Sequence, residues 1–542
     1  MNDRTKTGLE ILEAALLLGV LGDVLLRETP WGLNVFLWIT VLAAAMVALT
    51  LRRKKELWSV QTIGLHIALV FCAAMFVWRD SMELKLLNTL AILTILAVLT
   101  LPALNLKAQV AGVFHYVCAG IWSGINAGFA PFFLVFDDIK WKSIPQNGWT
   151  KHLVAVLRGL AIVAPILLIF GALFMAADAV FQGIIEKTFQ INPEVLLTHI
   201  FLIGLFSWIT AGYLRSSLVA FAAPDTKSEV KPQTLSITEQ TEEETNETKP
   251  SEKAKTWGWR SLDNSFLPKS LTLGAIETTV VLGLMNLLFL SFVIVQIPYL
   301  FGGMELVQTT PDFKLADYAR RGFGELVAVS ALVLPILLFS HWLLRKDSPI
   351  NEKIYRVLAG MNIVLLFVIM ISATNRLLLL TGNVGYGLTT IRLYPMAFMM
   401  WLALVFVWFG LTVLRGMRQQ FAWGALWSAL FMLGTLHVLN PDDFIVRTNV
   451  RLMQEGRTFD SRYVANLSDD AVPALLEAMP TMSFQQQCVV KHKLLHRLET
   501  VQTESDFRSW NWSRYVARNK MAQSNSAATD CPPETRSFYD DF

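Results

Sequence analysis

Charged residues are scarce in this sequence of 542 residues. Asp, Glu, Lys and Arg make up only 16% of the chain, whereas hydrophobic residues make up 54%. Soluble globular domains carry about 25% charged residues, so the composition excludes an ordinary soluble protein. The apolar residues are concentrated in runs of about 18 or more, long enough to cross a hydrocarbon core of about 30 Å. The sequence therefore predicts an all-α fold, a polytopic transmembrane helical bundle.

Cysteine is also scarce, and the short motifs of common catalytic sites are absent. Four cysteines are too few for a disulfide scaffold, and Cys488 and Cys531 are expected to pair only in an oxidising compartment. The chain has no G-x-x-x-x-G-K-S/T loop, H-E-x-x-H, C-x-x-C or G-x-S-x-G. His492 and His496 have metal-compatible spacing, but the lysines beside them favour a solvated basic face. We predict no catalytic residue, no cofactor and no metal site.

The apolar runs predict eleven membrane spans. They cover residues 9–26, 31–51, 57–77, 86–104, 160–177, 195–214, 273–297, 323–344, 357–373, 393–414 and 421–439. Lysine and arginine next to spans are retained in the cytoplasm. The basic cluster at residues 52–55 therefore places the N-terminus in the cytoplasm.

A further apolar stretch, residues 110–136, is interpreted differently. It is rich in glycine and contains Pro131 shortly before Asp137 and Asp138. A span here would move the basic residues that follow to the outer side, against the distribution of the other clusters. We therefore expect this stretch to be re-entrant or to lie in the membrane interface.

These features divide the chain into five parts. The N-terminal membrane half (1–222) is connected to the C-terminal membrane half (269–440) by an acidic linker (223–268). The linker is expected to be cytoplasmic and disordered because it has almost no large apolar side chains. Residues 441–523 have a soluble composition and predict a small C-terminal helical extramembrane domain, periplasmic by the span count. Residues 524–542 are expected to form a flexible tail.

Several segments of the chain form a recognisable set. They are Ala177-Asp178 after an Arg-Gly span, YARRGFGE at 318–325, YGLTTIRLY at 386–394, NPD at 440–442 with LSDDAVPAL at 467–475, and WNWSR at 510–514. Together they resemble a bacterial family of polytopic inner-membrane proteins known only as a domain of unknown function. The resemblance extends from about residue 9 to residue 521, apart from the linker. It implies a multi-pass protein of the bacterial inner membrane, and it carries no activity and no catalytic residues.

The candidate site consists of polar residues at the outer ends of spans. Arginine is normally depleted there, and its guanidinium group is the preferred fork for phosphate or carboxylate. An anionic ligand site is therefore hypothesised at Arg320, Arg321, Glu325, Arg376, Tyr386, Arg392 and Tyr394. The alternative, which the residue types favour, is a structural salt-bridge cluster in which the nearby carboxylates neutralise the arginines.

Three functions follow from these observations. The leading one is a non-enzymatic inner-membrane protein that binds an anionic envelope ligand, a lipid head group or a polymer, at its outer face in transport or sensing. The alternatives are a membrane-embedded enzyme of envelope lipid or glycan metabolism and a scaffold for envelope proteins. If the protein is a transporter, we expect a polar cavity at mid-depth of the membrane. If it is an enzyme, we expect a convergent acid–base cluster. The expected partners are the lipid bilayer and that anionic ligand; the net charge of +3 indicates no nucleic acid.

Overall fold

The protein is built of helices. The computed structural model describes residues 3–53, 58–141, 193–218, 272–301, 323–345, 348–382, 387–502, 506–524 and 531, together with 163 and 170. This part of the chain contains no β-strand, and ten of its helices are long and apolar enough to cross a membrane. The all-α, polytopic membrane fold is thereby confirmed. The predicted linker and nearly all of the predicted span 160–177 lie outside the described residues.

The N-terminal half contains six described long helices. They are α1 (Asp3–Leu26), α2 (Leu33–Arg53), α3 (Val60–Trp78), α4 (Met82–Leu99), α5 (Val113–Phe133) and α8 (Pro193–Leu218). The start of α3 is fixed by Ser59, whose hydroxyl accepts from the N–H of Thr62 at 3.3 Å. The helices share one hydrophobic core, in which Ile11, Leu18 and Leu65 are fully buried.

Helix α1 carries more charge than the other long helices, and the structure accounts for it. It lies antiparallel to α8 so closely that a Cβ at Gly19 would be 2.7 Å from a backbone carbonyl of α8. Such small residues let helices approach within a membrane. Two acids of α1 pair with other helices: Glu10 accepts from Arg53 Nε at 2.7 Å, and Asp23 Oδ2 lies 2.5 Å from His199 Nδ1. Pairing removes most of the penalty for polar groups at membrane depth.

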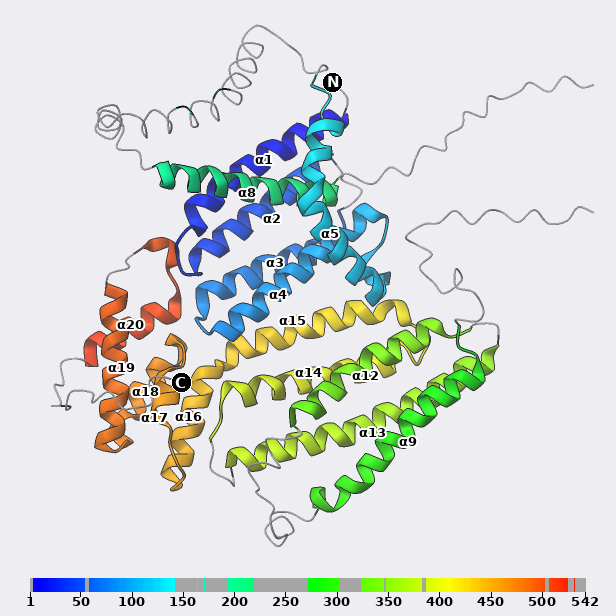
Figure 1. Cartoon of the computed structure of the whole chain (residues 1–542), viewed down its shortest axis with the longest axis vertical. Helices are drawn as coiled ribbons and strands as arrows, with labels where there is room; N and C mark the ends of the chain where they lie inside the picture. Colours follow the sequence, from blue (N-terminus) through cyan, green and yellow to red (C-terminus); the bar gives the residue numbers. More distant parts are fainter. Residues whose placement is uncertain are drawn as a thin grey trace, which may run out of the picture.

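The C-terminal half contains five described long helices. They are α9 (Ala275–Phe301), α12 (Phe323–Leu343), α13 (Pro349–Gly382), α14 (Thr390–Thr412) and α15 (Phe421–Leu439). Helices α9 and α13 pack along each other, and Asn286 Nδ2 donates to the carbonyl of Leu358 at 2.9 Å. Helix α15 lies between α4 and α14 (Figure 1), so it joins the two halves.

The C-terminal helices form a separate unit at one end of the bundle (Figure 1). They are α16 (Pro441–Gln454), α17 (Ser461–Ala465), α18 (Val472–Ala478), α19 (Phe484–Gln502) and α20 (Trp512–Ser524). Short 3-10 helices, among them η10 (Asp469–Ala471), η11 (Met479–Thr481) and η12 (Phe507–Ser509), connect them. The unit has its own hydrophobic core, which includes Ile445, Val472 and Val490. Cys488 and Cys531 form a disulfide within this unit, with their Cα atoms 5.5 Å apart.

The helix ends define two faces of the bundle. The domain face, against which α16–α20 lie, contains the ends of α1, α3 and α15 and the starts of α2 and α4. The opposite face contains the start of α1 and the ends of α2, α4, α8, α12 and α14, with the short helices η2 (Leu101–Leu104), η3 (Ala108–Val110), η4 (Leu134–Asp138) and η9 (Arg418–Gln420). This alternation is what a multi-pass membrane protein requires.

Helix α5 is long and apolar enough to cross a membrane, but it runs across the direction of α1, α2 and α8 (Figure 1). Near its start Phe114 stacks on Trp342 at the end of α12, with ring centroids 6.2 Å apart. Beyond its end Asp138 pairs with Arg4 at 2.6 Å and Arg215 at 2.5 Å. Both ends thus meet the opposite face. The re-entrant or interfacial placement stays a prediction, which this arrangement favours over a crossing helix.

Candidate functional site

A buried carboxylate, that of Asp470, fastens the C-terminal helices to the membrane bundle. No part of its side chain is exposed to solvent (0%), and Arg79 approaches it at 3.5 Å. It accepts hydrogen bonds from the backbone N–H groups of Asp80 and Ser81, at 2.7 and 2.9 Å, in the turn between α3 and α4. The hydroxyl of Ser513 in α20 adds a further, short bond. A buried carboxylate is stable only with such partners, so these contacts hold three distant segments together.

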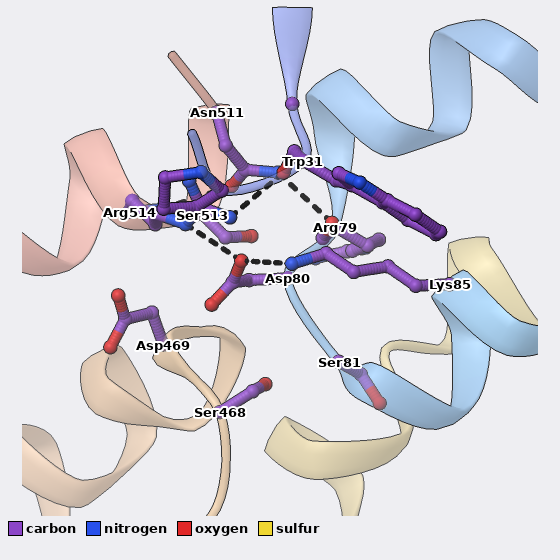
Figure 2. A network of polar contacts seen from close by, with 12 residues as sticks. Trp31, Arg79, Asp80, Ser81, Lys85, Ser468, Asp469, Asn511, Ser513 and Arg514 are labelled. Carbon is purple, nitrogen blue, oxygen red and sulfur yellow. Dashed lines mark hydrogen bonds and ion pairs between the residues drawn. The ribbon is translucent and has the colours of Figure 1, made fainter. Parts of the chain in front are cut away.

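Asp80 forms a second set of contacts at the same junction (Figure 2). Its carboxylate pairs with Lys85 at 2.7 Å and with Arg514 at 2.8 Å. Arg514 also donates to the backbone carbonyl of Trp31 at 2.8 Å. Asn511 completes the arrangement by donating to two carbonyls at the end of α3, at 2.8 and 2.9 Å. One guanidinium and one amide therefore connect α20 to the turns that precede α2 and α4.

Asp442, at the start of α16, is another buried acid beside this junction. Only 2% of the residue is exposed, and its Oδ2 accepts from the backbone N–H of Ser468 at 3.1 Å and from the Ser468 hydroxyl. Its buried Oδ1 has no hydrogen-bond partner among the described residues. Burial, opposed by the Ser468 bonds and reinforced by the charge of Asp470, raises the pKa of the Asp442 carboxyl to about 6. This carboxyl therefore takes up a proton at mildly acidic pH.

The junction continues into the membrane through Ser81, Glu83 and Tyr394. The Ser81 hydroxyl donates to Glu83 Oε2 at 2.9 Å, and it lies 3.2 Å from the hydroxyl of Tyr394 in α14. The two helices α4 and α14 thus bring a carboxylate and a phenol together at the domain face. Both side chains line the end of a groove.

This groove, about 570 Å³ in volume, runs between α4, α14 and α15. Along α4 it extends from Glu83 to Thr94, about 16 Å at the rise of an α-helix. The Thr94 hydroxyl is satisfied within its own helix by the carbonyl of Leu90, at 2.8 Å. The rest of the wall is mostly apolar and includes Leu86, Leu90, Phe398, Trp401, Leu430 and Leu433. An apolar groove with one polar end has the form of a site for an amphiphile.

The structure places part of the predicted site. Tyr394 reaches the groove, whereas Arg392, two residues earlier, donates a short bond to the carbonyl of Gly387. Glu325 is exposed in the first turn of α12. The remaining predicted residues cannot be placed by their side chains, because Arg320, Arg321 and Tyr386 lie outside the described residues and only the backbone of Arg376, in α13, is described. The convergence of the arginines stays a prediction.

The junction itself was missed by sequence reasoning. Asp442, Asp470 and Ser513 lie in three of the segments that carried the family resemblance, but no local pattern connects them. The contact between Asp80 and Asp470 spans 390 residues of sequence. An available signal was the pair Arg79 and Asp80, two charges in a short turn between two predicted spans.

The described residues contain no group of His, Cys, Asp and Glu side chains that could hold a metal ion. The acids of the junction are instead bonded to hydroxyl, N–H and guanidinium groups. Among described residues, the polar site is thus a docking network next to an apolar groove.

Comparison with known proteins identifies a family. Residues 66–478 match the model of a protein family described as Domain of unknown function (DUF4153). The matched region includes the groove, Asp442 and Asp470, and it ends before α19 and α20. No curated protein and no solved structure matches the chain.

Proposed function

Because the chain belongs to the DUF4153 family of unknown function, we propose a function from its geometry: it is an integral membrane protein that binds an envelope lipid at the domain face. The observation that carries the proposal is the groove between α4, α14 and α15, with apolar walls and with Glu83 and Tyr394 at one end. A hydrocarbon chain would lie along α4, and the head group would lie beside the docked C-terminal helices.

The groove favours a lipid over an envelope polymer, because a polar polymer has no apolar surface to pack against the apolar wall of the groove. The Glu83 carboxylate accepts hydrogen bonds from an amine or hydroxyl of the head group. The anionic part of the head group is assigned to the predicted arginines Arg320, Arg321, Arg376 and Arg392, with Tyr386 beside them, while the carboxylate of Glu325 competes with the anion for these arginines. This assignment keeps the anionic ligand of the leading hypothesis and adds the hydrocarbon chain to it.

The junction supports a binding protein over the enzyme alternative. A catalytic acid or base must lie within hydrogen-bond reach of the substrate. The Asp470 side chain is 0% exposed and bonded on several sides, and Asp442 is only 2% exposed. These acids converge, as an enzyme would require, but their environment is that of a docking contact.

We further propose that the domain face is periplasmic and the opposite face cytoplasmic. The disulfide between Cys488 and Cys531 supports this orientation, since disulfides persist in oxidising compartments. The basic residues at the end of α2 support it as well. Reporter fusions at residue 240 and after residue 524 should report opposite compartments. The same compartment for both fusions would overturn the orientation.

The lipid proposal is tested by filling the groove. Ala429 lines it on α15, so Ala429→Trp should expel the hydrocarbon chain. The matched control is Leu288→Trp on α9, a position that is 66% exposed and is not among the groove residues. Native mass spectrometry of protein purified in mild detergent should show a retained lipid in the wild type and in Leu288→Trp, and its loss in Ala429→Trp.

Head-group contacts are tested with the same readout. Glu83→Gln and Arg392→Gln should each reduce the fraction of protein that retains the lipid. Ser291→Ala, at an exposed position of α9, should leave this fraction unchanged. Equal lipid retention in Ala429→Trp and Leu288→Trp would refute the proposal that the groove holds the hydrocarbon chain. Loss of lipid in Ala429→Trp with unchanged retention in both polar variants would keep the chain site and reject the head-group assignment.

A further inference from the structure

A second cavity, on the opposite face, has a different chemistry from the groove. Its volume is about 1160 Å³. It lies between the segment that precedes and begins α5, the end of α12, the start of α13 and the turn between α14 and α15. We call it the basic pocket, because Lys107, Arg345 and Arg418 line it and Glu352 is the one acidic residue in the lining.

The charges of the basic pocket do not cancel one another. The carboxylate of Glu352 already pairs with Arg356, at 2.6 Å. Among the described residues, neither Lys107 nor Arg418 makes an ion pair. The amide side chains of Asn105, Gln419 and Gln420 in the lining add neutral hydrogen-bond donors. The cavity therefore combines concentrated positive charge with polar donors.

The positions of the cations are built into the fold. Arg345 donates from Nε to the Thr272 hydroxyl at 2.8 Å and from Nη2 to the Thr272 carbonyl at 3.1 Å. Its own N–H bonds to the carbonyl of Leu273 at 2.9 Å, which fastens the end of α12 to the start of α9. Arg418 begins η9, which contacts η3 directly after Lys107. Segments more than 300 residues apart in sequence thus present cations to one cavity.

Basic residues are common at the inner ends of membrane helices. Such residues, when they are scattered, do not by themselves indicate a ligand site. The basic pocket differs because its cations converge on a concave surface from three separate segments. Arginine matches phosphate oxygens with a planar fork, and lysine adds a point charge. Anions are concentrated in clefts lined by one sign of charge.

We propose that the basic pocket binds a phosphate group. Arg418 and Lys107 contact the phosphate oxygens, Arg345 is the third cation, and the amides of Gln419 and Gln420 complete the donor set. The phosphate can belong to a lipid head group or to a soluble phosphorylated molecule. The site lies on the face opposite the groove and does not depend on the lipid proposed there.

The test uses the full chain purified in neutral detergent and stripped of lipid. Its dissociation constant is measured by thermophoresis for three probes: inorganic phosphate, glycerol phosphate and a short-chain phosphatidic acid, with the phosphatidylcholine of equal chain length as the neutral-head control. Arg418→Gln is the pocket variant. Arg415→Gln is its matched control, because Arg415 is exposed in the same turn and does not line the cavity.

We expect at least one phosphate probe to bind, with the dissociation constant raised about tenfold by Arg418→Gln, as for the loss of one charge-assisted bond. Lys107→Gln should raise it as well, and Arg418→Lys should raise it less than Arg418→Gln. Binding of the soluble probes identifies a free phosphorylated ligand, whereas binding of phosphatidic acid alone identifies a lipid head group. Equal losses in Arg415→Gln and Arg418→Gln, or no binding of any phosphate probe, would overturn the proposal. If Arg418→Gln does not fold, the Lys107→Gln and Arg415→Gln pair decides.

Discussion

The two faces of the bundle hold their charges in different ways. On the domain face, Asp470 and Asp80 lie in closed networks that connect the C-terminal helices to the spans. On the opposite face, Asp138 is paired in the same manner with Arg4 and Arg215, but the basic pocket keeps its cations around a cavity. A buried charge must have partners for the protein to fold. In the basic pocket, Lys107 and Arg418 make no ion pair among the described residues, and both line the cavity.

The largest effect is expected from removing the central carboxylate of the domain face. Asp470→Ala would leave Arg79 and the N–H groups of Asp80 and Ser81 without this acceptor, which costs about 3–5 kcal/mol of unfolding free energy for a broken buried pair. The matched control is Glu477→Ala, at a surface carboxylate paired with Arg447 and Lys520, where we expect less than about 1 kcal/mol. Thermal and denaturant unfolding in detergent measure both. Similar losses of unfolding free energy in the two variants would contradict the distinction between the buried network of Asp470 and an exposed ion pair.

A pH-dependent effect is expected at Asp442. Its pKa of about 6 lies above the ordinary 3.8, so the folded state holds this proton more tightly than the unfolded state. The stabilisation is complete below about pH 4 and is lost as the pH rises through about 6; a shift of this size corresponds to about 3 kcal/mol. Asp442→Asn cannot ionise. Its stability relative to the wild type should therefore increase between pH 4 and pH 7, and a difference that is constant over this range would contradict the expectation.

A smaller effect is expected within the membrane. Asn286→Ala removes the bond to the carbonyl of Leu358 that connects α9 to α13, and such bonds contribute about 0.6 kcal/mol on average. Ser291→Ala on the same helix is the control, because that hydroxyl bonds only to its own helix among described residues, at the carbonyl of Leu288. Unfolding in detergent should separate the two variants by roughly this amount. A loss above about 2 kcal/mol would instead place Asn286 in a network as tight as that of Asp470.

The smallest effect is expected at the basic pocket. Arg418 has no ion pair among the described residues, so Arg418→Gln should change the unfolding free energy of the ligand-free protein by less than about 0.5 kcal/mol. A ligand that occupies the pocket would change this result by stabilising the wild type alone. The unfolding experiment is therefore carried out with and without inorganic phosphate. A large loss without phosphate would mean that the pocket is a structural contact like the domain face.

Much of the architecture was accessible from sequence because a bilayer imposes a strong, local requirement. A span needs about 20 consecutive apolar residues, and the predicted spans at 31–51, 57–77 and 421–439 fall on α2, α3 and α15. The soluble composition after residue 440 predicted the separate C-terminal helices. The span at residues 9–26 was predicted despite its acidic residues, but the partners of Glu10 and Asp23, which are Arg53 and His199, were not foreseen.

The sequence by itself therefore determined the membrane class, the positions of most helices and the family to which the chain belongs. The length of an apolar run depends only on consecutive residues, so it can be read directly from one sequence. Only the tertiary structure decided that Asp470 meets the turn at Asp80, that Tyr394 and Glu83 close one end of a groove, and that Lys107 and Arg418 share a cavity. These contacts depend on how helices pack across hundreds of residues, and the strength of a charge depends on the burial and partners that this packing creates.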